Sequence, residues 1–195
     1  MLDQLPVGNV IVDGIAVRDG SMMAQTQSID VDGRGPDMRF QPSYSTSGNG
    51  NIGTMGANWT HNFNSSIRIN SCGHVTVSGG DGGGVRFFPG PNNTLVLMGR
   101  LPLTLVSNSN DKTFDFYSKN GNRYHYIFAN ERVHWILDSI KDTNGNALKL
   151  VYDQDANQDP LLSKVVSTDG RALSFKYIQK RIAYKAYWPK AWLIP

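Results

Sequence analysis

The sequence has little of what several fold classes need. Glutamate occurs once, at Glu131, and good helix formers are scarce, whereas the chain has 20 Gly and 17 Asn. This composition excludes a helix bundle or a coiled coil, because Gly and Asn favour turns. The single cysteine, Cys72, excludes a scaffold of internal disulfides. No run approaches the roughly 20 apolar residues of a membrane-spanning helix, so no membrane span is expected. The first residues also lack the basic and apolar regions of a standard signal peptide.

Positive charge is confined to one end of the sequence. The net charge is +3, yet residues 176–195 carry five Lys and Arg and no acidic residue, which leaves residues 1–175 at −2. The basic balance therefore does not describe the body of the chain, and a nucleic-acid partner is not expected.

Apolar and polar residues alternate with a period of two in many short segments. This pattern predicts β-strands with one face in a core and the other in water. We predict a mainly β fold, with strands at 38–44, 66–70, 74–78, 85–88, 113–117, 123–128, 147–152 and 172–177.

Glycine-bearing turn signals separate these segments and recur along the chain. Asp81-Gly82, Asn120-Gly121, Asn144-Gly145 and Asp169-Gly170 suit type I′ hairpin turns, which require positive φ. The last three of these glycines follow one another at nearly equal intervals, and closing tyrosines come after two of them, at Tyr152 and Tyr177. A repeat of this length predicts antiparallel hairpins that form a curved or spiralling sheet. Gly145, Gly170, Tyr152 and Tyr177 are the expected structural anchors of the repeats.

Four parts of the chain follow from these patterns. Residues 1–27 are a lead-in, residues 28–65 an opening segment, residues 66–177 the hairpin repeats and residues 178–195 an atypical basic and aromatic tail. The tail has no Gly, Asn or Asp, and we interpret it as foreign to the repeat, as a truncated gene copy would produce. Trp59 is the one large residue in its Gly, Ala and Asn context, and we predict it to be a buried anchor.

The order and spacing of these motifs over residues 28–177 resemble the Rhs/YD-repeat family at the start of its repeat shell. The resemblance is carried by Gly33-Arg-Gly35 with Met38 to Tyr44, by Ile52-Gly-Thr-Met-Gly-Ala-Asn-Trp-Thr-His61, and by Asp142-Thr-Asn-Gly-Asn146 with Tyr152-Asp153. Pro42 stands where the family usually has Arg, which suggests an edge or a bulge.

The resemblance implies an incomplete Rhs-type β-shell. In full-length relatives, which are secreted or lie at the cell surface, such a shell encloses a C-terminal toxin or effector domain and works with secretion machinery. The expected function is thus structural: encapsulation and help with delivery, without enzymatic activity and without a cofactor. The alternative is a module that binds carbohydrate or a cell surface, through the loop 45–51 or through aromatic residues such as Trp59 and Trp135.

The strongest metal candidate is a loop with oxygen ligands at alternating positions: Asp153, Asp155, Asn157 and Asp159. This spacing suits Ca²⁺, but Gln158 and Lys164 replace the Gly and the bidentate Glu of a calcium loop. We therefore expect a solvated hairpin loop and no metal site. Cys72 with His74 lacks the second pair of ligands that zinc needs.

Two further residue patterns are candidates for a catalytic or a phosphate-binding site. Asp115, Glu131 and Asp138 are the acidic residues that a glycan-active hydrolase would use as an acid/base pair. The alternation around Asp115 instead places it on a solvated outer face. Residues 79–84 are glycine-rich, but without the Lys-Ser/Thr ending of a phosphate loop they indicate a flexible hairpin turn.

Overall fold

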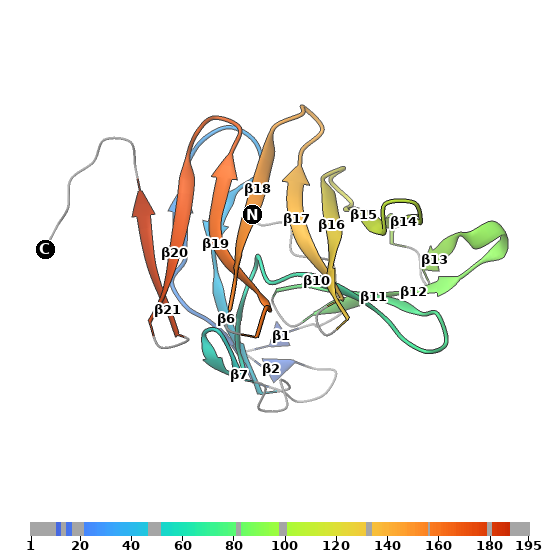
Figure 1. The fold of residues 1–195 in the computed structure, drawn as a ribbon, viewed down its shortest axis with the longest axis horizontal. Coiled ribbons are helices and arrows are strands. Elements are labelled where there is room, and N and C mark those ends of the chain that lie inside the picture. Colours follow the sequence, from blue (N-terminus) through green and yellow to red (C-terminus); the bar gives the residue numbers. More distant parts are fainter. Residues whose placement is uncertain are drawn as a thin grey trace, which may run out of the picture.

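The structure, a computed structural model, is built almost entirely of antiparallel strands (Figure 1). It describes residues 11–12, 15–16, 22–46, 52–80, 83–97, 101–131, 134–155, 157–178 and 181–187. The described residues contain no α-helix, and a short 3₁₀ turn, η2, spans Pro91–Asn93. The predicted mainly β fold is confirmed.

Twelve strands, all from Ser66 onward, make one sheet. They are β10 (Ser66–Ile69), β11 (Val75–Ser78), β12 (Gly84–Pro89), β13 (Leu95–Leu97), β14 (Thr104–Asn108), β15 (Thr113–Tyr117), β16 (Arg123–Asn130), β17 (His134–Lys141), β18 (Ala147–Gln154), β19 (Pro160–Ser167), β20 (Ala172–Ile178) and β21 (Arg181–Tyr187). The order β13-β12-β11-β10-β17 continues into β18-β19-β20-β21, while β14, β15 and β16 join at the other side of β17.

β17 is the strand at which the sheet divides. Along one side it pairs with β16, whereas its other side pairs with β10 at Trp135 and Ile136 and with β18 from Ser139 to Lys141. The strands from β10 to β17 curl into a nearly closed sheet, and β18 to β21 leave it as a row of hairpins. β17 therefore belongs to both parts.

The first part of the chain forms smaller sheets. β3 (Met23–Gln25), β6 (Pro42–Ser45) and β9 (Trp59–His61) make one. Three two-stranded pairs are β1 (Ile11–Val12) with β2 (Ile15–Ala16), β4 (Ile29–Val31) with β5 (Met38–Phe40), and β7 (Ile52–Gly53) with β8 (Gly56–Ala57). We call residues 22–65 the amino-terminal segment. It packs against the inner face of the hairpin strands, where the Phe40 and Phe175 rings lie 5.1 Å apart.

One hydrophobic core joins the two parts. Every second residue of the strands enters it, so that Phe114 and Phe116, Leu148 and Leu150, and Leu173 and Phe175 are all buried. The amino-terminal segment adds Met38, Phe40 and Phe63, each at most 2% exposed. The inner face of the sheet is thus filled by this chain's own side chains.

All eight predicted strands are present, within a few residues of their expected ends. The strand expected at 38–44 is two strands, β5 and β6, which are separated at Gln41. β17 and β19 were not predicted as full strands, and each contains a register shift that interrupts the alternation. Asp138 is the extra residue opposite the step between His125 and Tyr126, and Ser163 is the extra residue opposite the step between Val151 and Tyr152.

The segment expected to stand apart from the repeats contributes a strand. Residues 181–187 pair with β20 in register from Ile178↔Arg181 to Ala172↔Tyr187. Residues 179–180 and 188–195 of that tail lie outside the described residues.

Candidate functional site: the rim of hairpin turns

Three equivalent turns lie at one end of the sheet, at 118–122, 142–146 and 167–171. In each, the first residue accepts a hydrogen bond from the glycine N–H and donates its own N–H to the carbonyl of the fifth residue. The glycines Gly121, Gly145 and Gly170 have φ between 81° and 91°. The residues before them are not among those with positive φ, so the predicted type I′ turns are wrong here. The turns are three-residue loops with a bulge at a left-handed glycine. Asp81-Gly82 lies outside the described residues.

The loop between β4 and β5 lies across two of these turns. A Cβ on Gly33 would stand 2.0 Å from Cζ of Arg171, and a Cβ on Gly35 would stand 2.6 Å from Cβ of Asn146. Asn146 and Arg171 each follow the turn glycine of successive repeats, so the Gly-Arg-Gly spacing bridges one repeat. Gly35 is required, because its φ is 94° and a side chain would strike Asn146, while at Gly33 a side chain would displace the guanidinium group of Arg171.

All three guanidinium nitrogens of Arg171 form hydrogen bonds, two of them to this loop and one within its own turn. Nη1 donates to the Val31 carbonyl at 2.5 Å and Nη2 to the Arg34 carbonyl at 2.9 Å, while Nε bonds the Asp169 carboxylate at 2.7 Å. Asp169 also accepts the Arg34 N–H at 3.2 Å. The hydrogen bond from Arg171 holds the pKa of Asp169 well below its usual range. We call this group of contacts the clasp; it joins backbone and side chains that are far apart in the sequence.

A polar pocket of about 270 Å³ opens beside the clasp. It is lined by Asp30, Val31, Asp32, Gly33, Pro36, Asp37, Met38, Arg39 and Arg171. Asp30 pairs with Arg39, and Arg171 is bound in the clasp.

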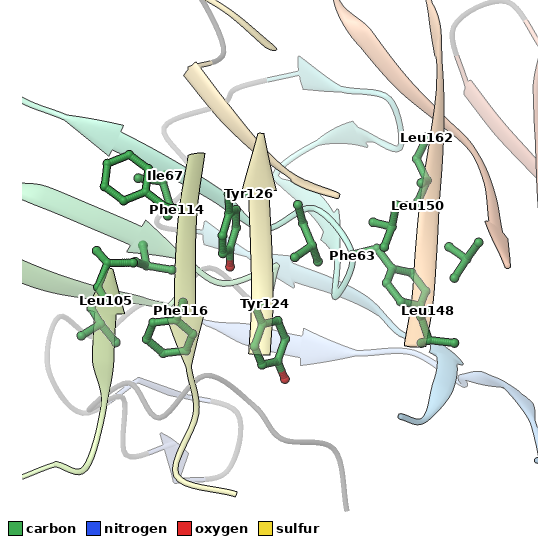
Figure 2. Close-up of a cluster of buried hydrophobic side chains, with 14 of the residues drawn as sticks. Phe63, Ile67, Leu105, Phe114, Phe116, Tyr124, Tyr126, Leu148, Leu150 and Leu162 are labelled. Carbon is green, nitrogen blue, oxygen red and sulfur yellow. The ribbon is translucent and has the colours of Figure 1, made fainter. Parts of the chain in front are cut away.

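The amino-terminal segment contributes to the buried hydrophobic core, where Phe63 lies beside Leu148 and Leu150 of β18 (Figure 2). The ring of His61 packs on Phe40, with 5.2 Å between their centroids, and lies 6.5 Å from the ring of Phe175. It is 5% exposed, and its Nδ1 has no hydrogen-bond partner in the described part of the chain. Burial lowers the pKa of His61 to about 4.

The predicted anchors Tyr152 and Tyr177 occupy equivalent places in successive repeats. Their hydroxyls donate to the carbonyls of Leu137 at 2.6 Å and Leu162 at 2.7 Å, which lie one repeat apart like the tyrosines themselves. Each carbonyl directly precedes the extra residue of its strand, where the ladder of backbone hydrogen bonds is interrupted. Burial raises the pKa of both phenols, for Tyr177 to about 12. The tyrosines thus satisfy the backbone at each bulge.

Trp59 is half-buried, so the prediction that it is a buried anchor is wrong. Its ring lies 5.4 Å from that of Tyr44. The buried aromatic residues of this region are Phe40 and Phe63 instead. Trp59 stands at the start of the short strand β9, whereas Phe40 and Phe63 are members of the hydrophobic core.

The calcium candidates form a turn of the same kind as the rim turns. Asp155 Oδ1 accepts the N–H groups of Asn157 at 2.7 Å and Asp159 at 2.9 Å, and Gln158 takes the left-handed position with φ 63°. Asp153 is exposed on β18. Among the described residues, no three His, Cys, Asp or Glu side chains are grouped as metal ligands. Here the Asp155 carboxylate caps the backbone of the turn.

Two of the three acidic hydrolase candidates pair with basic side chains. Asp115 is 8% exposed, which corrects the expected solvated outer face; His125 at 2.7 Å and Arg123 at 2.9 Å cover its carboxylate. Asp138 is paired with Lys149, and Glu131 is exposed.

The remaining candidates are separated from one another. Cys72 is exposed in the turn at 70–74, whose cap is Asn70, and the ring of His74 lies against Phe88 at 4.6 Å. Gly80 approaches the backbone of His61, because a Cβ there would stand 1.9 Å from its carbonyl oxygen. Among the aromatic candidates, Tyr124 and Tyr126 are core residues, and Trp135 packs against the core.

Sequence reasoning missed the clasp. The available signal was the repeat alignment itself, in which Arg171 replaces Asn146, together with the two glycines at 33 and 35 that flank Arg34. Neither short motif indicates by itself that residues 33–35 contact the turn at 167–171.

Residues 13–87 match the family model for a domain of unknown function (DUF6531), which is less than half of the chain. The match includes residues 31–35 of the clasp and His61, but not the rim turns at 118–122, 142–146 and 167–171. No curated protein matches the chain. In the part of the chain that the structure describes, no helix is both long enough and apolar enough to cross a membrane.

Proposed function

We propose that this chain is the closed, non-catalytic end of an Rhs-like β-shell. In its full-length form the shell would enclose a C-terminal toxin or effector domain and help to deliver it. The hairpin repeats would form the wall, and the amino-terminal segment would seal the end at which the wall starts.

The observation that carries this proposal is the seating of the amino-terminal segment on two successive repeats. The Gly33-Arg34-Gly35 loop spans the turns at 142–146 and 167–171, and Phe40 and Phe63 fill the sheet below them. A filled interior leaves this end with no room for cargo, as a seal requires. A cargo would lie beyond the hairpin strands.

The repeat unit also supports the proposal. Tyr152 and Tyr177, with Leu137 and Leu162, make the same hydrogen bond in successive repeats. Such a unit extends a sheet by adding hairpins, because each repeat contacts its neighbours in the same way. The resemblance of residues 28–177 to the Rhs/YD-repeat family points in the same direction.

The test is to express residues 1–177 joined in frame to the sequence that is encoded downstream of the Tyr177 codon. The rate at which protease digests this added C-terminal part is then measured. We expect that part to resist digestion. We expect Arg171→Ala, which opens the clasp, to speed its digestion, while Arg123→Ala, on the outer face, leaves it unchanged.

Two results would contradict this proposal. One is a following sequence that encodes neither further repeats nor an effector. The other is a C-terminal part that is digested equally fast with and without residues 22–65. Specific binding on a glycan array would instead favour the alternative, a carbohydrate-binding module.

A further inference from the structure

We propose that His61 is an acid-sensitive latch: protonation of its imidazole releases the amino-terminal segment from the hairpin sheet. This device goes beyond the proposed function, since it depends on the contact between the two parts and not on what a shell encloses.

The surroundings of His61 suit a neutral imidazole ring, and among the described residues they offer no acidic group that would stabilise a protonated one. The imidazole lies at the end of β9 and forms a ring cluster with Phe40 of β5 and Phe175 of β20, at the contact between the two parts. Its backbone is closely covered, since a Cβ on Gly80 would stand 1.9 Å from the His61 carbonyl oxygen. Protonation would place a charge on a buried ring whose Nδ1 has no hydrogen-bond partner in the described part of the chain, which is costly.

No described charged group compensates a charge on His61. On the strands that pack against it, the neighbouring charged positions are Arg39 on β5 and Lys176 on β20. They alternate to the opposite face: Arg39 pairs with Asp30, and Lys176 is exposed. Burial is accordingly the cause of the lowered pKa.

The direction of the pH effect follows from the two protonation states. The imidazole has a pKa of about 4 when docked and 6.5 as its reference value, so the released state binds the proton more readily. Docking is therefore at full strength above about pH 6.5 and weakens as the pH falls toward 4. The difference between these two pKa values corresponds to an increase of roughly 300-fold in the ratio of released to docked chains.

The clasp responds in a separate range. The pKa of Asp169 is lowered from its reference value of 3.8, so the stability that this carboxylate adds is lost only as the pH falls below about 4. Loss of docking between pH 6.5 and 4.5 therefore reports on His61 and not on the clasp.

Hydrogen exchange by mass spectrometry on the full chain tests the latch. We expect the protection factors of peptides covering 38–45 and 59–63 to fall by roughly tenfold for each pH unit between 6.0 and 4.5. Peptides from β18 and β19 are expected to keep more of their protection. In His61→Phe, which keeps an aromatic ring that cannot be protonated, the protection of 38–45 is expected to be independent of pH in this range.

Two further variants keep the test decisive. His61→Leu serves if the phenylalanine ring does not fit, and it too is expected to remove the pH dependence. His74→Gln is the matched control, because His74 packs on Phe88, away from the contact; it is expected to behave as the parent chain. Equal acid loss of protection in the parent and in the His61 variants would overturn the proposal, as would protection of 38–45 that is constant in the parent.

Discussion

Arg171 ties together segments that are far apart in the sequence. Its guanidinium group bonds two backbone carbonyls of the amino-terminal segment and the carboxylate of Asp169 in its own turn. The side chain is 11% exposed, so these hydrogen bonds are largely shielded from water. Charged hydrogen bonds of this kind contribute more than exposed ion pairs.

We expect Arg171→Ala to lower the free energy of unfolding by about 2–3 kcal/mol, because it leaves two carbonyls and a carboxylate without their donor. Urea denaturation followed by circular dichroism measures this. The matched control is Arg123→Ala: Arg123 also pairs with an aspartate but is 42% exposed, and its loss is expected to cost less than about 1 kcal/mol. Equal effects of the two substitutions would show that the clasp adds no stability.

At the scale of the hairpin, one turn geometry recurs in both parts of the large sheet. The turns at 70–74, 118–122, 142–146, 155–159 and 167–171 share the same pair of backbone hydrogen bonds. Four of them have Gly at the left-handed position, and the fifth has Gln158 with φ 63°. A non-glycine residue in this conformation is strained by contact between its Cβ and the backbone.

The element-scale prediction is therefore that Gln158→Gly stabilises the protein, by about 0.5–1 kcal/mol, because relief of the strain outweighs the entropy that glycine adds to the unfolded chain. The reverse change, Gly145→Gln, is expected to cost about 1–2 kcal/mol. Midpoints of urea denaturation compare the two. A destabilising Gln158→Gly would mean that the Gln158 side chain makes a contact worth more than the strain.

The extent to which these elements could be predicted depends on whether the deciding contact is local. Alternation located the strands from β10 to β12 and β15, β16, β18 and β20, since it depends only on neighbouring residues. β17 and β19 were missed as full strands because Asp138 and Ser163 shift the pattern to the other face in mid-strand. The predicted turn type was wrong because Asn-Gly and Asp-Gly suit several kinds of loop. The loop is determined by the backbone hydrogen bonds of the residue two positions before each Asn-Gly or Asp-Gly pair.

The contacts between segments were beyond the reach of local reasoning. Trp59 was expected in the core because of its size, but it is half-buried at the start of β9, whereas His61 at the end of the same strand is buried. The clasp needs residues 31–34 and 169–171 to meet, and no periodic pattern encodes that meeting. The anchor positions Tyr152 and Tyr177 were found from the repeat, but their partners, the carbonyls at the bulges, were not.

On the scale of the whole molecule, a single core is shared by the amino-terminal segment, the nearly closed sheet and the hairpin strands. Phe40 lies where the amino-terminal segment meets the hairpin strands, since it is 1% exposed and packs on Phe175 of β20. Because the core is continuous, a loss of packing is expected to destabilise all three parts together at neutral pH, where His61 is neutral and the amino-terminal segment is docked.

Phe40→Ala is expected to cost about 3–5 kcal/mol, as for other large aromatic residues removed from a core. The loss should appear equally in tryptophan fluorescence and in far-UV circular dichroism, since one core predicts one transition. Val106→Ala is the control: Val106 is 41% exposed, and the change is expected to stay within about 0.5 kcal/mol. Two separate transitions in the Phe40→Ala variant would show that the parts unfold independently.

The division of the sheet at β17 also sets an order for folding during synthesis. β10 to β13 leave the ribosome before β17, yet Ser66 and Ile67 of β10 pair with Ile136 and Trp135, which are made much later. Until β17 is made, β10 keeps an open edge, and the loop that must close to cover it is long. The first hairpins therefore wait for β17, and its arrival completes the nearly closed sheet and starts the row of repeats in one step. A pause in translation before β17 would leave that edge exposed to neighbouring chains.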